Sequence, residues 1–302
     1  MKKFRAIAAY AIVALTVAAF IFYAVKNPKL WTQLSQVNIF IVILLIALYF
    51  LSLGAIVLVY YYTLELCNVK MPSRENFRLT AYSLIINFFG PLQSGPGFRA
   101  VYLKAKYKLT FKRFILASLL YYLFFGVISV FFALSGSAYW RWSLLFLPLV
   151  IIFVAVVFKT NIPFVGKWLN KKDGTSLNMS YPIITKLAIA TLLQVILVSA
   201  IYFIELKTVS STISLRQAIS YSGVANLTIF VAITPGGIGI REAFLLLSQK
   251  LHHIPPHTII AASFLDRAVD VAFLGILFVI TISLHFKEKL DIKKAEPVKL
   301  KD

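Results

Sequence analysis

The sequence predicts an all-α, polytopic membrane helix bundle with about six spanning helices and two re-entrant elements broken by proline and glycine. Hydrophobic residues make up 60% of the 302 positions and charged residues only 14%, and several apolar runs are long enough to cross a bilayer. In addition, two Pro/Gly motifs interrupt the apolar sequence in a matching way. We therefore expect a single integral membrane domain over 1–302, with halves of about 1–140 and 141–286 and a basic tail over 287–302.

Six apolar runs have the length and composition of membrane-spanning helices. They cover 6–25, 38–62, 114–134, 142–158, 183–204 and 258–284. The first run follows Met1-Lys2-Lys3-Phe4-Arg5, which is typical of a signal peptide. It is longer than the usual signal-peptide core, however, and no small-x-small cleavage site follows it. We interpret it as an uncleaved first span.

Two further apolar stretches have the wrong shape for plain spanning helices. The first broken element, 79–98, ends in the motif Gly90-Pro91-Leu92-Gln93-Ser94-Gly95-Pro96-Gly97-Phe98-Arg99. The second broken element, 217–249, contains Thr234-Pro235-Gly236-Gly237-Ile238-Gly239-Ile240-Arg241-Glu242. Lipid cannot satisfy free backbone N–H and C=O groups, so such breaks are expected only inside protein or beside a wet cavity. Paired breaks in the two halves of a chain point to a transport site.

The two motifs also match residue by residue. At one constant offset, Gly95, Gly97, Phe98, Arg99 and Leu103 fall on Gly237, Gly239, Ile240, Arg241 and Leu245. This match is what an inverted repeat of the two halves predicts. Short Gly/Pro motifs also match by chance, so from the sequence alone both explanations stay open.

The net charge of +20 is concentrated in segments beside the apolar runs. These segments are Lys2 to Arg5, Arg99 to Arg113, Lys159 to Lys172 and the tail after His285. The positive-inside rule places all four in the cytoplasm, and with them both termini. The first broken element must then enter and leave from the cytoplasmic side, and the second from the outside. A soluble basic surface for nucleic acid is not predicted, so the expected partners are anionic lipid headgroups of the cytoplasmic membrane.

Charged side chains within apolar sequence mark the expected site, because in a membrane they are costly and normally face the bundle interior. The candidates for substrate binding are Arg99, Arg241, Gln93 and Asn226, and those for gating or ion pairing are Glu242, Asp266, Arg267 and Asp270. Arginine suits a phosphate because its planar fork donates two hydrogen bonds at once. The backbone breaks are expected at Gly95, Pro96, Gly97, Pro235, Gly236, Gly237 and Gly239.

Two interpretations of this charged set stay open. It forms a substrate or proton path, or it is a structural ion-pair network that locks the second broken element to the last helix. For Arg99 alone, anchoring at the headgroups is a further alternative.

The sequence offers no recognisable catalytic set and no ATPase motif. The single cysteine, Cys67, forms no internal disulfide, and the four histidines lack metal-site spacing, so neither a metal nor a cofactor is expected. Gly90-x4-Gly95 lacks the lysine and Ser/Thr of a phosphate loop, and no strand precedes Gly95-x-Gly97 as a dinucleotide fingerprint requires. We expect a protein that is not an enzyme, in which any transport runs downhill or on a gradient.

With these motifs placed, the chain resembles the lysylphosphatidylglycerol synthase transmembrane region, a flippase-like family of membrane proteins. The resemblance is carried by Gly95-Pro96-Gly97-Phe98-Arg99-Ala100, the basic stretch from Lys104 to Arg113, the motif from Thr234 to Ala243, and Asp266-Arg267. Family members often have an acidic residue just after the first glycine-rich turn, where this chain has Phe98-Arg99-Ala100. We expect the chain to lack the aminoacyltransferase domain of the family's synthases, so the resemblance implies lipid translocation rather than lipid synthesis.

Two functions therefore remain open. In the first, the protein is a flippase that moves an anionic phospholipid or a polyprenyl-phosphate lipid across the cytoplasmic membrane. In the second, it is a membrane module that transports nothing and docks a separate lipid-modifying enzyme.

Overall fold

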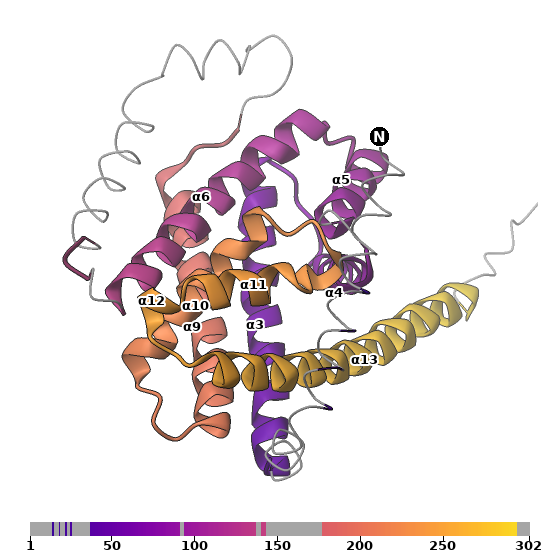
Figure 1. Ribbon diagram of the computed structural model, residues 1–302. Coiled ribbons are helices and arrows are strands. Elements are labelled where there is room, and N and C mark those ends of the chain that lie inside the picture. Colours follow the sequence, from indigo (N-terminus) through magenta and orange to yellow (C-terminus); the bar gives the residue numbers. More distant parts are fainter. Residues whose placement is uncertain are drawn as a thin grey trace, which may run out of the picture.

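The computed structural model describes residues 37–90, 94–136, 140–142 and 177–294, with side chains as far as 284, and four isolated positions before them. Within this part every regular element is a helix (Figure 1). The predicted spans 6–25 and 142–158 lie almost wholly outside the described residues, as does Gln93, so these expectations remain predictions.

Four helices of the described part are long and apolar enough to cross a membrane. They are α3 (Ile39–Leu66), α6 (Phe111–Ser135), α9 (Tyr181–Val209) and α13 (Pro256–Lys294). Each extends a predicted span by a few residues, and α13 continues into the basic tail. The outward faces of α3 and α9 expose large apolar side chains, among them Phe40, Leu51, Ile189 and Leu192. Such faces suit lipid rather than water.

Shorter helices make up both broken elements. The first consists of α4 (Ser73–Phe89) and α5 (Ser94–Tyr107), and the second of α10 (Leu215–Leu227), the 3₁₀ turns η2 (Thr228–Phe230) and η3 (Pro235–Gly237), α11 (Ile240–Leu247) and α12 (Gln249–His252). The start of α10 is fixed by a capping box, in which the Ser214 hydroxyl accepts the Gln217 N–H and the Gln217 side chain accepts the Ser214 N–H. The second broken element, which the sequence predicted to begin at 217, therefore begins at Leu215.

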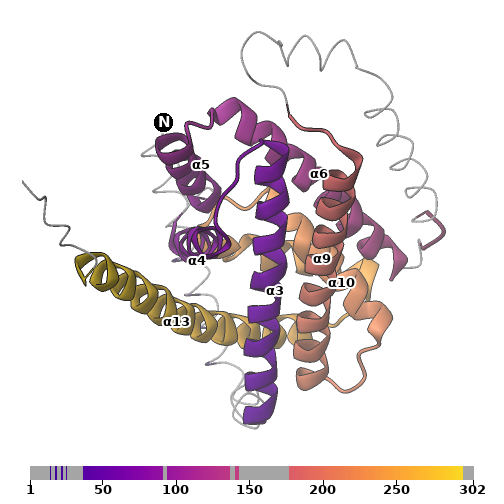
Figure 2. The same cartoon turned by 180° about the vertical axis from the view of Figure 1, so that it is seen from behind.

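Helices α3 and α9 pack against each other along their lengths and lie side by side at the face of the bundle that is turned toward the viewer in Figure 2. They run antiparallel. The N–H of Asn178, just before α9, donates to the carbonyl of Leu66 at the end of α3 over 2.7 Å. Near the other end, Leu45 of α3 packs in one cluster with Ile201 of α9. The end of α3 and the end of α9 therefore lie at opposite ends of the bundle.

Each broken element is a hairpin that returns to the end from which it started. At the base of the α4–α5 hairpin, the Tyr102 hydroxyl donates to the Glu75 carboxylate over 2.7 Å. At the base of the second hairpin, Gln217 donates to the carbonyl of His253, which follows α12, over 3.1 Å. Because α4 follows α3 and α10 follows α9, the two hairpins start near opposite ends of the antiparallel pair α3 and α9. Their entry into a membrane from opposite faces stays a prediction.

The helix pattern repeats with inversion. The helices α3 and α9 start at Ile39 and Tyr181, and α4 and α10 at Ser73 and Leu215; both pairs lie 142 residues apart. The packing repeats as well: α9 contacts α6, α10 and α13, and its counterpart α3 contacts α13, α4 and α6. Since the counterparts α3 and α9 are antiparallel, the two halves are related as an inverted repeat, and chance similarity of the two motifs is no longer a sufficient explanation.

Candidate functional site

The backbone of the second broken element follows a path that requires glycine. Gly236 and Gly239 have φ angles of 57° and 83°, a region that side chains with a Cβ rarely adopt. A Cβ on Gly236 would also lie 3.2 Å from the ring of Phe88, which is near the end of α4. The predicted break at Pro235 to Gly239 is therefore present, and its tip touches the first broken element in the middle of the bundle.

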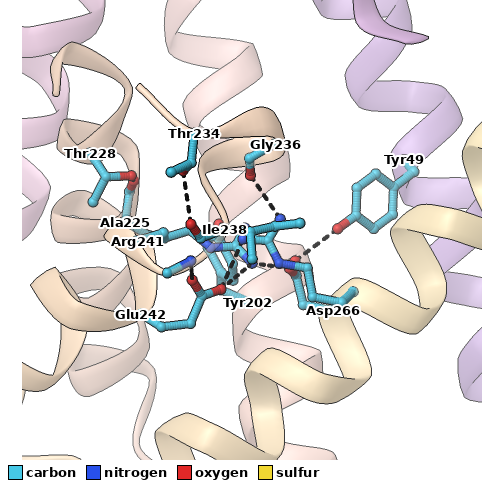
Figure 3. A network of polar contacts seen from close by, with 12 residues as sticks. Tyr49, Tyr202, Ala225, Thr228, Thr234, Gly236, Ile238, Arg241, Glu242 and Asp266 are labelled. Atoms are coloured by element: carbon cyan, nitrogen blue, oxygen red, sulfur yellow. Dashed lines mark hydrogen bonds and ion pairs between the residues drawn. The ribbon is translucent and has the colours of Figure 1, made fainter. Parts of the chain in front are cut away.

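An ion-pair network attaches this break to α13 (Figure 3). The guanidinium of Arg241 pairs with the Asp266 carboxylate and, over 3.4 Å, with Glu242; it also donates to the Tyr202 hydroxyl of α9 over 3.1 Å. The Tyr49 hydroxyl of α3 donates to Asp266 over 2.9 Å. Asp266 thus faces inward and meets Arg241, as its position within a spanning helix predicted.

Arg267, which also lies on α13, fixes the break in place as well. It donates to the carbonyl of Gly236 over 2.9 Å and to Glu242 over 2.8 Å. Glu242 in turn accepts the N–H of Gly239 over 2.8 Å. The charged residues therefore do lock the second broken element in place, which is one of the two interpretations that the sequence left open.

Most of this network, namely Arg241, Asp266 and Arg267 with Tyr49 and Tyr202 but not Glu242, also lines a cavity of about 310 Å³. Its walls come from α3, α4, α6, α9, α10, α13 and the stretch from η2 to the start of α11. Its charged and amide lining residues are Asn87, Gln194, Asn226, Arg241, Asp266, Arg267 and Asp270. The second interpretation, a polar path, is therefore compatible with the first, because one set of side chains both fixes the backbone and faces an internal space.

Several polar atoms at this cavity have no hydrogen-bond partner among the described residues. They are the Nδ2 of Asn226, the Oδ1 of Asn87, and the Nε atoms of Arg241 and Arg267. Buried polar atoms normally find a partner, and each of these atoms belongs to a side chain that lines the cavity. Gln194 differs, because it accepts a hydrogen bond from Tyr121 of α6 over 3.3 Å and so joins two helices.

Two guanidinium groups and two carboxylates line the cavity, and a third carboxylate, that of Glu242, pairs with the arginines beside it. Arg241 and Arg267 face Glu242, Asp266 and Asp270. Asp270, one turn beyond Asp266, lines the cavity and has no ion pair within the described part of the chain. Of the two aspartates expected to gate or to form ion pairs, Asp266 therefore forms an ion pair and Asp270 forms none among the described residues.

Arg99 does not reach the cavity, contrary to the expectation that it is a substrate-binding residue there. It is 0% exposed, its guanidinium stacks 3.5 Å from the ring centroid of Tyr60, and it donates to Asn76 and Thr80 of α4. A buried cation held by aromatic and neutral oxygen partners packs the first hairpin against α3. Headgroup anchoring is excluded by the same burial.

The first Pro/Gly motif also differs from its prediction. Helix α4 ends before Gly90, whereas Gly95, Pro96 and Gly97 lie in the first turn of α5 and are helical. Proline is tolerated in a first turn because its missing N–H would be unpaired there anyway. Gly95 serves close packing instead, since a Cβ there would lie 2.2 Å from the carbonyl oxygen of Ser83 in α4.

The repeat relates the two arginines and their aromatic partners. Tyr60 and Tyr202 are 142 residues apart, as are Arg99 and Arg241, and each arginine contacts its own tyrosine. The surroundings differ: Arg99 has neutral partners, whereas Arg241 has an acid on α13. The ionic site therefore belongs to the second half alone.

Three residues near the site were missed by sequence reasoning. Tyr49 and Tyr202 lie inside apolar runs, where tyrosine is common and nothing in the sequence marks a hydroxyl as part of a site. Glu205 lies on α9 and is 0% exposed. Because the predicted span ends at 204, the sequence does not place this residue inside the membrane. The scarcity of acids, eleven in the chain, is the signal that could have found it.

These features define an α-helical integral membrane protein with a charged cavity where two inverted repeats meet. The sequence profile of the family described as Lysylphosphatidylglycerol synthase TM region matches residues 6–277. The chain belongs to this family, as its motifs suggested, and membership links it to a membrane lipid-related function. A comparison with curated proteins finds no match.

Proposed function

We propose that this protein is a lipid flippase of the cytoplasmic membrane and not an enzyme, and that it moves an anionic phospholipid or a polyprenyl-phosphate lipid between leaflets. The observation that carries the proposal is the cavity with charged and amide side chains in its wall, to which both broken elements contribute residues together with α3, α9 and α13. Transport sites in inverted-repeat proteins lie at such a repeat interface and are formed by discontinuous helices.

The size of the cavity supports a headgroup as cargo. A volume of about 310 Å³ corresponds to about ten waters at ~30 Å³ each, enough for a phosphate-bearing headgroup but not for acyl chains. The chains would stay in the bilayer beside the exposed apolar helix faces. Arg241 and Arg267 supply the donors for the phosphate, and the unpaired amide of Asn226 supplies another.

In this proposal both broken elements are re-entrant, the first from the cytoplasm and the second from outside, with the N- and C-termini cytoplasmic. Single cysteines at Ala105 and Lys250, in a Cys67→Ala background, test this arrangement. We expect a membrane-impermeant thiol reagent to reach position 105 from the cytoplasmic side and position 250 from the outside. Labelling of both positions from one side would contradict it.

Flipping of a fluorescent anionic phospholipid in proteoliposomes tests the function itself. We expect wild-type protein to flip the probe, Arg241→Lys to retain partial activity because lysine lacks the bidentate fork, and Arg241→Ala to lose activity. Arg216→Ala, at an exposed arginine of α10, is the matched control and should flip normally. If well-folded wild type leaves the probe in place, the flippase proposal fails and the docking-module alternative takes its place.

A further inference from the structure

Glu205 is a buried carboxyl group that the flippase proposal leaves unused. Its side chain is 0% exposed, and neither carboxylate oxygen has a hydrogen-bond partner within the described residues. It follows Ile201 and Tyr202, which line the cavity, by one turn of α9. It therefore lies just behind the cavity wall.

Charged and titratable groups of α3, α9, α10, α11 and α13 lie around Glu205. The groups that interact with it electrostatically, or share its immediate neighbours, are Tyr49 of α3, Tyr202 of α9, Tyr221 of α10, Arg241 of α11, and Asp266, Arg267 and Asp270 of α13. With Glu242 included, four carboxyl groups meet two guanidinium groups. Four ionised carboxylates at this depth would be an unbalanced charge that membrane interiors strongly disfavour.

Binding of an anion makes this imbalance worse. Arg241 is already paired with Asp266, so a phosphate that takes Arg241 leaves Asp266 with the Tyr49 hydroxyl as its remaining hydrogen-bond donor. Asp266 would then stand beside Asp270 and Glu205 without its cation. A proton on one of these carboxyls removes the repulsion, and by linkage the anion and the proton favour each other's binding.

We propose that Glu205 binds a proton that crosses the membrane together with the anionic headgroup, which makes the protein a proton–lipid symporter. Asp270 lines the cavity and has no cationic partner in the described part, so it is the group through which the proton exchanges. One proton taken up on one side and released on the other compensates one negative charge of the lipid. This inference rests on the proposed flippase function.

The test uses full-length protein in proteoliposomes with a trace of fluorescent phosphatidylglycerol and a pH gradient of about one unit. For one proton per lipid, we expect the probe to accumulate about tenfold in the leaflet that faces the alkaline compartment, because one pH unit is about 1.4 kcal/mol. Glu205→Gln should abolish this enrichment, and Glu65→Gln, at the other end of the bundle on α3, should keep it.

The outcomes separate the two proposals. Wild-type protein that flips the probe but distributes it equally, or enriches it only along a sodium gradient, would overturn proton coupling and leave the flippase standing. Wild type that does not flip at all would overturn both. As a readout independent of transport, infrared spectra of purified protein should show the carbonyl band of a protonated carboxylic acid that Glu205→Gln removes; its persistence in that variant would overturn the assignment to Glu205.

Discussion

Replacing Asp266 by asparagine should destabilise the fold more than replacing Asp266 and Arg241 together. The side chains of Asp266 and Arg241 are 4% and 14% exposed, so their ion pair is largely shielded from solvent. Removing one partner of a buried pair costs about 3–5 kcal/mol, since the other charge stays buried. Glu242 remains 3.4 Å from Arg241, so we expect the lower end, about 3 kcal/mol. The asparagine keeps an oxygen for the Tyr49 hydroxyl, so the change isolates the charge.

In the double variant Asp266→Asn/Arg241→Gln, no lone cation remains, because Glu242 keeps its contact with Arg267. We expect this variant to be about 1 kcal/mol more stable than Asp266→Asn alone, within the usual range for coupled neighbours. Reversible unfolding in mixed detergent–SDS micelles measures each free energy of unfolding. Asp270→Asn is the control, and it should cost less than about 1 kcal/mol because no ion pair is lost. Equal costs for Asp266→Asn and Asp270→Asn would refute the reasoning.

Three further predictions concern the first hairpin. Gly95→Ala should reduce folded yield sharply, because its Cβ would overlap a carbonyl of α4, whereas Gly97→Ala, whose Cβ would meet nothing within 4 Å, should be neutral or stabilising; detergent-extracted, monodisperse protein is the measure. Arg99→Ala should lower thermal stability, and its residual folded fraction should still flip lipid, because this cation lies outside the cavity. Although burial raises the pKa of the Glu75 carboxyl, hydrogen bonds led by that from Lys106 lower it overall. The stability it contributes should therefore be present at neutral pH, fade as pH falls through its folded pKa, and be absent at all pH values in Glu75→Gln, as pH-dependent unfolding would show.

The sequence alone predicts those features that the bilayer imposes on a short segment of the chain. The candidate spans at α3, α6, α9 and α13 follow from apolar length, since a single segment satisfies its own backbone in a bilayer only as a helix. The break at Gly236 follows from proline and glycine chemistry. The pairing of Asp266 follows from the cost of an unpaired charge at membrane depth.

Other features depend on contacts between residues far apart in sequence. Arg99 and Arg241 occupy matching positions, yet only the structure reveals that Tyr60, Asn76 and Thr80 enclose the first and that the second lines a cavity. Local pattern does not specify which side chains a neighbouring helix will present. For the same reason the role of Gly95, which depends on the approach of α4, was mistaken for a backbone break.

Occupancy of the cavity by the lipid headgroup is the central claim, and a cysteine in its wall tests it most directly. Ser52 of α3 lines the cavity and is nearly isosteric with cysteine, whereas Gly54 on the same helix is exposed and outside it. In a Cys67→Ala background, we predict that thiol modification of Ser52→Cys stops flipping, that anionic lipid slows this modification, and that modified Gly54→Cys flips normally. Undiminished flipping by fully modified Ser52→Cys would contradict the account.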